Sequence, residues 1–212
     1  MIIHHTLRAV LVAAICLLTG CLARPHLDQQ FFLFAPPPAS SAAKAAPGSR
    51  VLGIRSLQVA SSFEGREFVY RTGAFSYDSD TYAEFMVPPA EGLVSPICAW
   101  VREGGMFSAV AEAGSGLKPD TLVEIHVAQH YGEFRSSEQA TAVLAMRFVF
   151  FDAPRGNPGK VLLQQEYTRA IPLKARTAAA LIEGWNLALA QILEAAMLDF
   201  GRLDTNPPKQ GS

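Results

Sequence analysis

Apolar residues at every second position dominate the chain from about residue 121 to residue 171. In residues 121–134, one predicted face carries Val123, Ile125, Val127 and Tyr131, and the other carries Glu124, His126 and His130. A period of two is that of a β-strand. Residues 140–152 and 160–171 predict two further strands, and the glycines and prolines of residues 153–159 predict a hairpin turn between them.

Shorter strands are predicted before these three. Residues 51–60 are β-like, but their apolar parity changes from Leu52 and Ile54 to Leu57 and Val59, which indicates a bulge or twist. Residues 67–73 and 74–80 predict two strands turned at Gly73, and residues 106–112 predict another short strand.

Two segments have helical periodicity. In residues 88–105, Leu93, Ile97 and Val101 recur at helical spacing, and Gly104 and Gly105 predict the end. Pro96 either kinks this helix or, with Ser95, marks its cap and first position. Residues 177–200 predict a long helix whose apolar stripe consists of Leu181, Trp185, Ala188, Leu189, Ile192 and Ala196.

The second helix carries few charges on any face and therefore needs cover on more than one side. Either the sheet and the first helix supply that cover, or part of the helix faces a second protomer or a partner subunit. The order of elements does not alternate strand and helix as a parallel-sheet protein does. We therefore expect an α+β fold with an antiparallel β-sheet and two main helices packed on one face.

The N-terminus has the order of an export signal. Arg8 precedes an uncharged apolar run at residues 9–18, which is shorter than the roughly 20 residues of a membrane span. Leu18, Thr19, Gly20 and Cys21 resemble a bacterial lipobox. This resemblance implies cleavage before Cys21, with diacylglycerol on its thiol and an N-acyl chain, typically palmitate, on its amine; the alternative is an ordinary secretory signal.

The cleavage site sets the domain boundaries. Residues 1–20 are the lipoprotein signal peptide, which removes Cys16, and residues 21–50 are a lipidated tether and linker with a short strand at 31–34. Residues 35–49 are rich in proline, alanine and serine and predict a linker. Residues 51–200 form the folded domain, and residues 201–212 a disordered tail. Only Cys98 then remains beside Cys21, so no internal disulfide is available.

The residues do not predict catalysis, a metal or a cofactor. His126 and His130 on a strand would be roughly 13 Å apart, too far for one zinc ion, so a solvated strand face is the preferred interpretation. The chain lacks G-x-S-x-G and the P-loop spacing. Its formal net charge of −1 becomes more negative when Arg8 is removed, which does not favour nucleic acid. Cys98 lies among apolar residues and is expected to be a small buried hydrophobe.

Residues 31–200 resemble the ABC-type transport auxiliary lipoproteins, a PqiC-like family that accompanies MCE proteins. The family's L-V-Y-R segment corresponds to Phe68-Val69-Tyr70-Arg71, and its Y-x-E-F/W-x-x-P-P element to Tyr82, Glu84, Phe85, Pro88 and Pro89. A G-x-F-x-x-V strand follows at Gly105, Phe107 and Val110. The sequence departs from the family at Phe85, where many relatives have Trp, and at Pro96.

The resemblance implies a non-enzymatic subunit, lipid-anchored in the periplasm, of a system that moves lipids or hydrophobic compounds between the two membranes. Its implied partners are an MCE protein, through it an ABC permease and ATPase, and a homo-oligomer. Leu22 after the cysteine, by resemblance to other bacterial lipoproteins, implies the outer membrane of a Gram-negative bacterium.

The expected partner surface consists of Phe68, Tyr70, Arg71, Phe75, Tyr77 and Tyr82; the alternative is that these side chains only pack a hairpin on the core. A periplasmic lipid-binding shuttle, a structural lipoprotein of another envelope complex and a hydrolase remain open.

Overall fold

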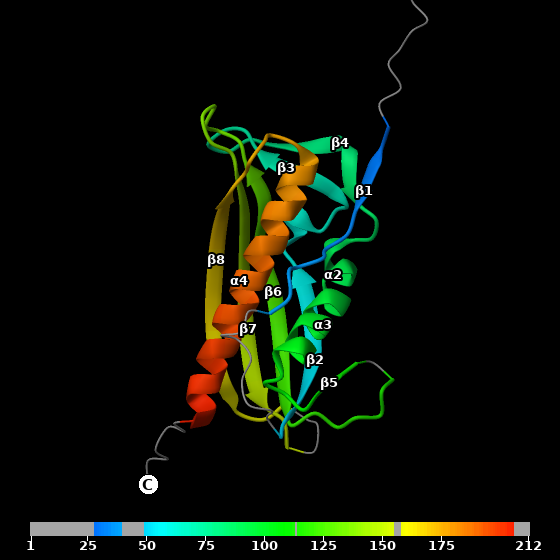
Figure 1. The fold of residues 1–212 in the computed structure, drawn as a ribbon, viewed down its shortest axis with the longest axis vertical. Coiled ribbons are helices and arrows are strands. Elements are labelled where there is room, and N and C mark those ends of the chain that lie inside the picture. Colours follow the sequence, from blue (N-terminus) through cyan, green and yellow to red (C-terminus); the bar gives the residue numbers. More distant parts are fainter. Residues whose placement is uncertain (1–27, 40–48, 113, 155–157, 206–212) are drawn as a thin grey trace, which may run out of the picture.

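The computed structural model describes residues 28–39, 49–112, 114–154 and 158–205 (Figure 1). The predicted signal peptide, the lipobox residues Leu18, Thr19, Gly20 and Cys21, and most of the predicted linker lie outside this part. The described strands are β1 (Gln30–Phe32), β2 (Val51–Val59), β3 (Glu67–Arg71), β4 (Tyr77–Phe85), β5 (Ala109–Ala111), β6 (Thr121–Glu133), β7 (Thr141–Asp152) and β8 (Val161–Pro172). The helices are η2 (Ser61–Phe63), α2 (Pro89–Gly92), α3 (Val94–Gly104) and α4 (Ala178–Thr205).

All the described strands join one sheet, and β6 is its central member. β7 pairs with β6 antiparallel along its full length, and β8 continues the sheet antiparallel to β7. On the other side of β6, β2 pairs with the first half and β3 with Gly132 and Glu133, both parallel to it. β2 and β3 therefore follow one another along a single edge of β6.

The α+β class with two main helices is confirmed, but the sheet is mixed rather than purely antiparallel. The long ladders β6–β7 and β7–β8 are antiparallel, as is β3–β4. α2 and α3 carry the chain from β4 back along the sheet, so that β5 and then β6 enter parallel to β2. The alternation of apolar and polar residues within one strand does not reveal such a crossover, so the parallel pairs could not be predicted from it.

Both main helices cover the same face of the sheet (Figure 1). Trp185 and Leu189 of α4 are fully buried, together with Phe148 and Phe150 of β7. Gly184 permits this contact, because a Cβ there would lie 2.6 Å from the Cβ of Ala142. By length and composition α4 is the one helix in the described part that is long and apolar enough to cross a membrane, but 61% of its most apolar window is buried in this fold. Here it is a core helix.

A turn divides the predicted first helix into α2 and α3. Pro96 is the third residue of α3, in the first turn, where a missing backbone N–H leaves no helical hydrogen bond unmade. The helix begins at Val94, not at Pro96, and the break before it lies at Leu93. Gly105 ends α3 with a left-handed φ of 72°.

A bulge in β6 overturns the predicted alternation of that strand. Its register with β7 shifts between Val127 and Gln129, and the extra residue moves every later side chain to the other face. His130 is consequently buried in the core, and Tyr131 lies on the opposite face, the reverse of the expectation. The bulge predicted in β2 is present, between Ile54 and Ser56.

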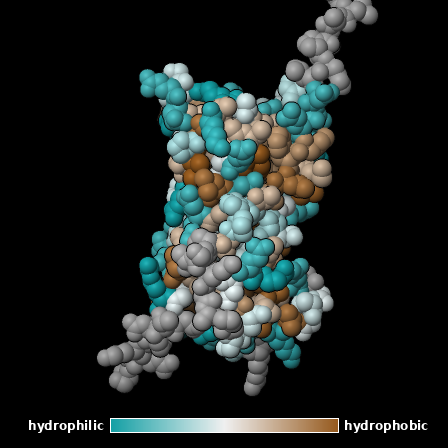
Figure 2. All heavy atoms as spheres, in the orientation of Figure 1, coloured by the Kyte–Doolittle hydropathy of each residue, from teal (hydrophilic) through white to brown (hydrophobic). Residues whose placement is uncertain are grey.

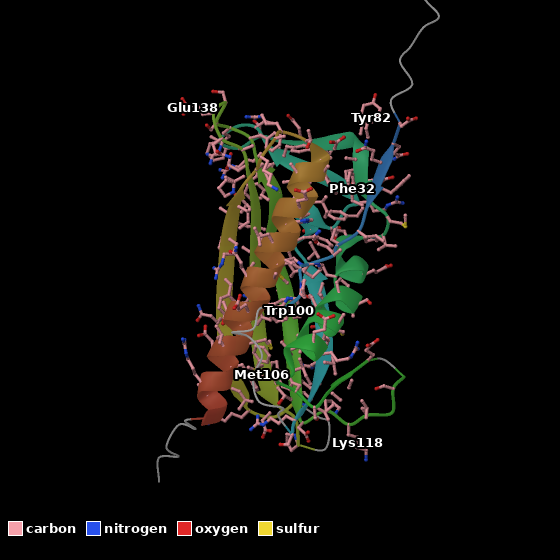
Figure 3. The ribbon with its side chains drawn as sticks, in the orientation of Figure 1. Phe32, Tyr82, Trp100, Met106, Lys118 and Glu138 are labelled. Carbon is pink, nitrogen blue, oxygen red and sulfur yellow. The ribbon has the colours of Figure 1, made fainter. Side chains whose placement is uncertain are left out.

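The segment that follows β1 crosses the helical layer as a strap of residues 33–39. Phe34 stacks on Phe85 with ring centroids 4.9 Å apart. The backbone N–H of Ala35 donates to Asn186 Oδ1 of α4 at 2.9 Å, and Trp100 Nε1 of α3 donates to the carbonyl of Pro37 at 3.1 Å. Figure 3 labels Trp100 between the two helices. The strap therefore supplies part of the cover that α4 needs.

Two expected boundaries differ in the structure, one at each end of the domain. Residues 35–39, predicted as the start of a linker, are packed on the domain, and β1 lies at Gln30–Phe32, next to β4. α4 runs on to Thr205, so residues 201–205, predicted as tail, are helical. The described part of the chain begins seven residues after Cys21.

Candidate functional site

The six residues predicted as a partner surface do not form one surface. Phe68 is fully buried, with its ring 4.7 Å from that of Phe85 and 4.9 Å, edge-on, from that of Trp185. Its prediction as a surface residue is wrong, because β3 alternates and Phe68 faces the helices. Of the other five, Tyr70 is partly buried against the core, Arg71, Phe75 and Tyr77 lie at the end of the β3–β4 hairpin, and Tyr82 lies on the outer face of β4.

Asp80 hydrogen-bonds to both strands of the β3–β4 hairpin. Its Oδ2 accepts the Tyr70 hydroxyl at 2.6 Å, and its Oδ1 accepts the backbone N–H groups of Tyr82 and Ala83 at 2.8 and 3.0 Å. Burial, followed by the hydrogen bond to Asp80, raises the pKa of Tyr70 above its ordinary value. Tyr70 is therefore a structural hydrogen-bond donor. Asp80 was not predicted from the sequence, because its only signal there is its place in a turn-like run of serine and aspartate.

The hairpin end, defined as Arg71, Phe75 and Tyr77, presents one free aromatic ring on a fixed base. Arg71 donates to the carbonyl of Ala74 at 2.9 Å and lies 5.8 Å from the centre of the Tyr77 ring. Phe75, at the turn, is 96% exposed. Such an aromatic side chain on a rigid turn is a common anchor of protein–protein interfaces.

Two rings of the opposite sheet face hold Tyr77. The Tyr77 ring stands edge-on to Phe63 and to Tyr131, with centroids 6.2 and 5.7 Å away. Phe63 belongs to η2, between β2 and β3, and Tyr131 reaches this face because of the β6 bulge. The bulge that buries His130 thus also builds the base of the hairpin end.

Paired charges flank this base. Glu133 accepts from Arg135 at 2.8 Å and lies 3.8 Å from Arg71. The hydrogen bond from Arg135 is the main cause that lowers the pKa of the Glu133 carboxyl. The hairpin end therefore combines an exposed ring with a polar surround, as interface patches do.

The two histidines lie on opposite faces of β6. His130 is buried against Trp185, with ring centroids 4.1 Å apart, and burial lowers its pKa to about 3. His126 faces away from the helices, in a shallow depression with Glu124 and Arg147. Within the described ranges no group of three His, Cys, Asp or Glu side chains is placed to hold a metal. Cys98 is buried in α3, and its burial raises the pKa of the thiol.

A second exposed set lies on the outer face of the β1–β4 pair. Phe31, Leu33 and Met86 are each about half exposed, at 48%, 53% and 53%, and Tyr82 is 47% exposed. We call these four residues the β1 patch. Alternation explains it, because Phe32 and Phe34 point into the core while Phe31 and Leu33 point out. Figure 2 shows apolar side chains gathered at the upper right, where β1 lies in Figure 1.

A small apolar cavity lies between the sheet and the helices. Its volume is about 10 Å³, and it lies among Leu52, Ile97, Val101, Phe148 and Met197. That volume is near the minimum that holds one water molecule. This cavity does not accommodate a lipid chain.

The comparisons with known proteins identify the fold. No protein-family model and no curated protein matches the sequence. A protein from Xanthomonas campestris described as DUF330, the PqiC-like family, superposes with a TM-score of 0.69 at 16% identity over 83% of this chain and 99% of its own. An uncharacterized protein superposes with a TM-score of 0.59 at 13% identity over 82% of this chain and 97% of its own. The chain therefore shares the fold of these solved structures.

Proposed function

We propose that this protein is a non-catalytic envelope lipoprotein of a Gram-negative bacterium, anchored through Cys21 on the periplasmic face of the outer membrane. In this proposal it is an auxiliary subunit of an ABC/MCE-type system that moves lipids or hydrophobic compounds between the membranes. The hairpin end docks on the MCE-type protein, which connects it to the permease and ATPase, or on a second copy of the chain.

The observation that carries the proposal is the exposure of Phe75 on a hairpin whose base is rigid. The Tyr70–Asp80 hydrogen bond and the edge-on contact of Tyr77 with Tyr131 hold the strands, so docking at the turn costs little ordering of the backbone. The fold shared with the DUF330 protein supports the assignment to an auxiliary lipoprotein. The lipobox-like residues before Cys21 support the anchor.

The anchor is tested by Cys21→Ala in the full chain. We expect the variant to leave the membrane fraction while its circular dichroism and melting temperature remain those of the wild type, because the described domain begins at residue 28. A variant that still sediments with membranes contradicts the anchor. A variant that unfolds contradicts the separation of anchor and domain.

The docking surface is tested by Phe75→Ser. The side chain is almost fully exposed, so the substitution removes a contact ring without opening the core. We expect crosslinked membranes to yield less MCE-type partner or less homo-oligomer with Phe75→Ser than with wild type. Leu117→Ser, at a half-exposed leucine far from the hairpin, is the matched control and retains full capture. Equal capture by both variants overturns the assignment of the hairpin end.

A further inference from the structure

The β1 patch lies close to the predicted lipid attachment point along the chain. Seven residue steps separate Cys21 from Asp28, the first described residue, and they span at most about 25 Å when fully extended. Phe31 and Leu33 follow within five residues. Residues 40–48 come after the strap and therefore do not lengthen the connection between anchor and body.

β1 and the strap fasten this part of the chain to the domain. β1 pairs with β4, and the carbonyl of Phe32 accepts the N–H of Met86 at 2.9 Å. Phe34, Ala35 and Pro37 then hold the chain to the sheet and to both helices. A lipid on Cys21 would therefore hold the β1 side of the domain close to the bilayer.

The composition of the patch suits the interface of a bilayer. It exposes a leucine, a methionine, a phenylalanine and a tyrosine, and leucine, phenylalanine and tyrosine are residue types that enter the boundary between headgroups and acyl chains. Beside it, Arg66 and Glu84 are paired: Arg66 bonds Glu84 at 2.9 Å, and its guanidinium lies 5.7 Å from the centre of the Phe31 ring. Gln29 also donates to Glu84, at 2.6 Å. The patch therefore offers apolar surface, and because the Glu84 carboxylate is paired it repels headgroup phosphates less.

From this combination we propose that the β1 patch, Phe31, Leu33, Tyr82 and Met86, is a membrane-contact surface that orients the domain on the bilayer beside its own anchor. The inference rests on the lipid anchor of the proposed function. It reassigns Tyr82 from the partner surface to the bilayer. The hairpin end stays available to a protein partner, because β1 pairs with Ala83–Phe85 at the end of β4, whereas the hairpin turn precedes Tyr77 at the start of β4.

The cysteine content permits a direct test on the full, lipidated chain. Cys21 carries lipid in the proposed mature protein and Cys98 is buried, so one introduced cysteine is the accessible thiol. Met86→Cys places an environment-sensitive fluorophore in the patch. Leu117→Cys places it next to Lys118, at the opposite end of the molecule from Tyr82 (Figure 3). Both proteins are reconstituted in phosphatidylethanolamine and phosphatidylglycerol vesicles that contain a headgroup-proximal nitroxide lipid.

We expect the nitroxide to quench the fluorophore at position 86 severalfold more strongly than at position 117. Adding Phe31→Ser and Leu33→Ser should abolish most of this difference, whereas Leu187→Ser, a similarly exposed leucine on α4, should leave it intact. Circular dichroism of each variant establishes that it is folded. Weak and equal quenching at both positions overturns the proposal.

Two other results are distinguishable from these. A fluorophore at position 86 that is already shielded in detergent without lipid, in a protein that elutes as an oligomer, shows that a second copy covers the patch and overturns the proposal. The intact mass of the isolated protein reports acylation independently of quenching. A mass without acyl chains contradicts the anchor itself, and the inference falls with it.

Discussion

Ala35 and Asn186 are joined by a 2.9 Å hydrogen bond from the backbone N–H of the first to the side-chain oxygen of the second, although 151 positions separate them in sequence. This bond fastens the N-terminal strap to the middle of α4. It makes the strap, residues 33–39, part of the fold.

Removing the acceptor should loosen the strap locally. Asn186→Ala loses one hydrogen bond, worth about 1 kcal/mol, and we expect faster amide exchange at the strap residues that carry an N–H, Leu33, Phe34, Ala35 and Ala39, with little change at β6. Gln191→Ala, a partly exposed position on the same helix, is the control and should leave exchange in the strap unchanged. Unaltered exchange in Asn186→Ala would show that the bond does not hold the strap.

Two phenylalanines three residues apart should differ sharply in their contribution to stability. Phe34 is buried against Phe85 and His130, so Phe34→Ala should lower the free energy of unfolding by about 3 kcal/mol. Phe31 is half exposed, and Phe31→Ala should cost less than about 1 kcal/mol. Urea unfolding measures both, and equal costs would contradict the docked strap.

Two glycines of α4 should respond in opposite directions to alanine. Gly184→Ala places a Cβ 2.6 Å from that of Ala142 in the packed core, which should destabilise by about 1 to 3 kcal/mol. Gly201→Ala meets the flexible end of Met106 at 3.1 Å, so the helix propensity of alanine should leave stability unchanged or raise it by up to about 1 kcal/mol. Thermal melting of the two variants distinguishes these outcomes. A stabilised Gly184→Ala would refute the close packing of α4 on β7.

His130 should make stability depend on pH. Burial lowers its pKa to about 3 in the folded protein, from 6.5 for a free histidine. Between these values the unfolded chain binds a proton that the folded chain does not, so stability falls as pH decreases from about 6.5 towards 3. The slope contributed by this group approaches about 1.4 kcal/mol per pH unit.

Urea unfolding at pH 7, 6, 5 and 4 measures this slope. His130→Phe removes the titrating group and should flatten the profile in this range, even if it changes the stability at pH 7. His126→Gln, on the other face of β6, should retain the wild-type slope. A profile that stays steep in His130→Phe would contradict the burial of a neutral imidazole.

The sequence predicted the elements well because their periodicity is local. The strands β6, β7 and β8, the helix α4 and the end of α3 at Gly105 all follow from apolar spacing and a glycine in a left-handed conformation. The β6 bulge did not follow from the pattern, since its register is set by pairing with β7. His130 and Tyr131 were therefore assigned to the wrong faces.

The candidate site was less predictable because it depends on contacts between distant segments. Tyr77 was identified from aromatic composition, but its neighbours Phe63 and Tyr131 come from elsewhere in the sheet. Phe68 was misplaced because an aromatic cluster does not distinguish the two faces of a short strand. The proline-rich residues 35–39 carry no periodicity, so only their packing against α3 and α4 reveals the strap.

The most direct test of the proposed function is site-specific photocrosslinking from residue 75 in intact membranes. A photoreactive amino acid replaces Phe75 in the full, lipidated protein, and the same amino acid at Leu117 is the control. The proposal predicts a crosslinked product with an MCE-type protein, or with a second copy of the chain, from position 75 and not from position 117. Uncrosslinked monomer from position 75, in membranes where acylation at Cys21 is verified by mass, would contradict it.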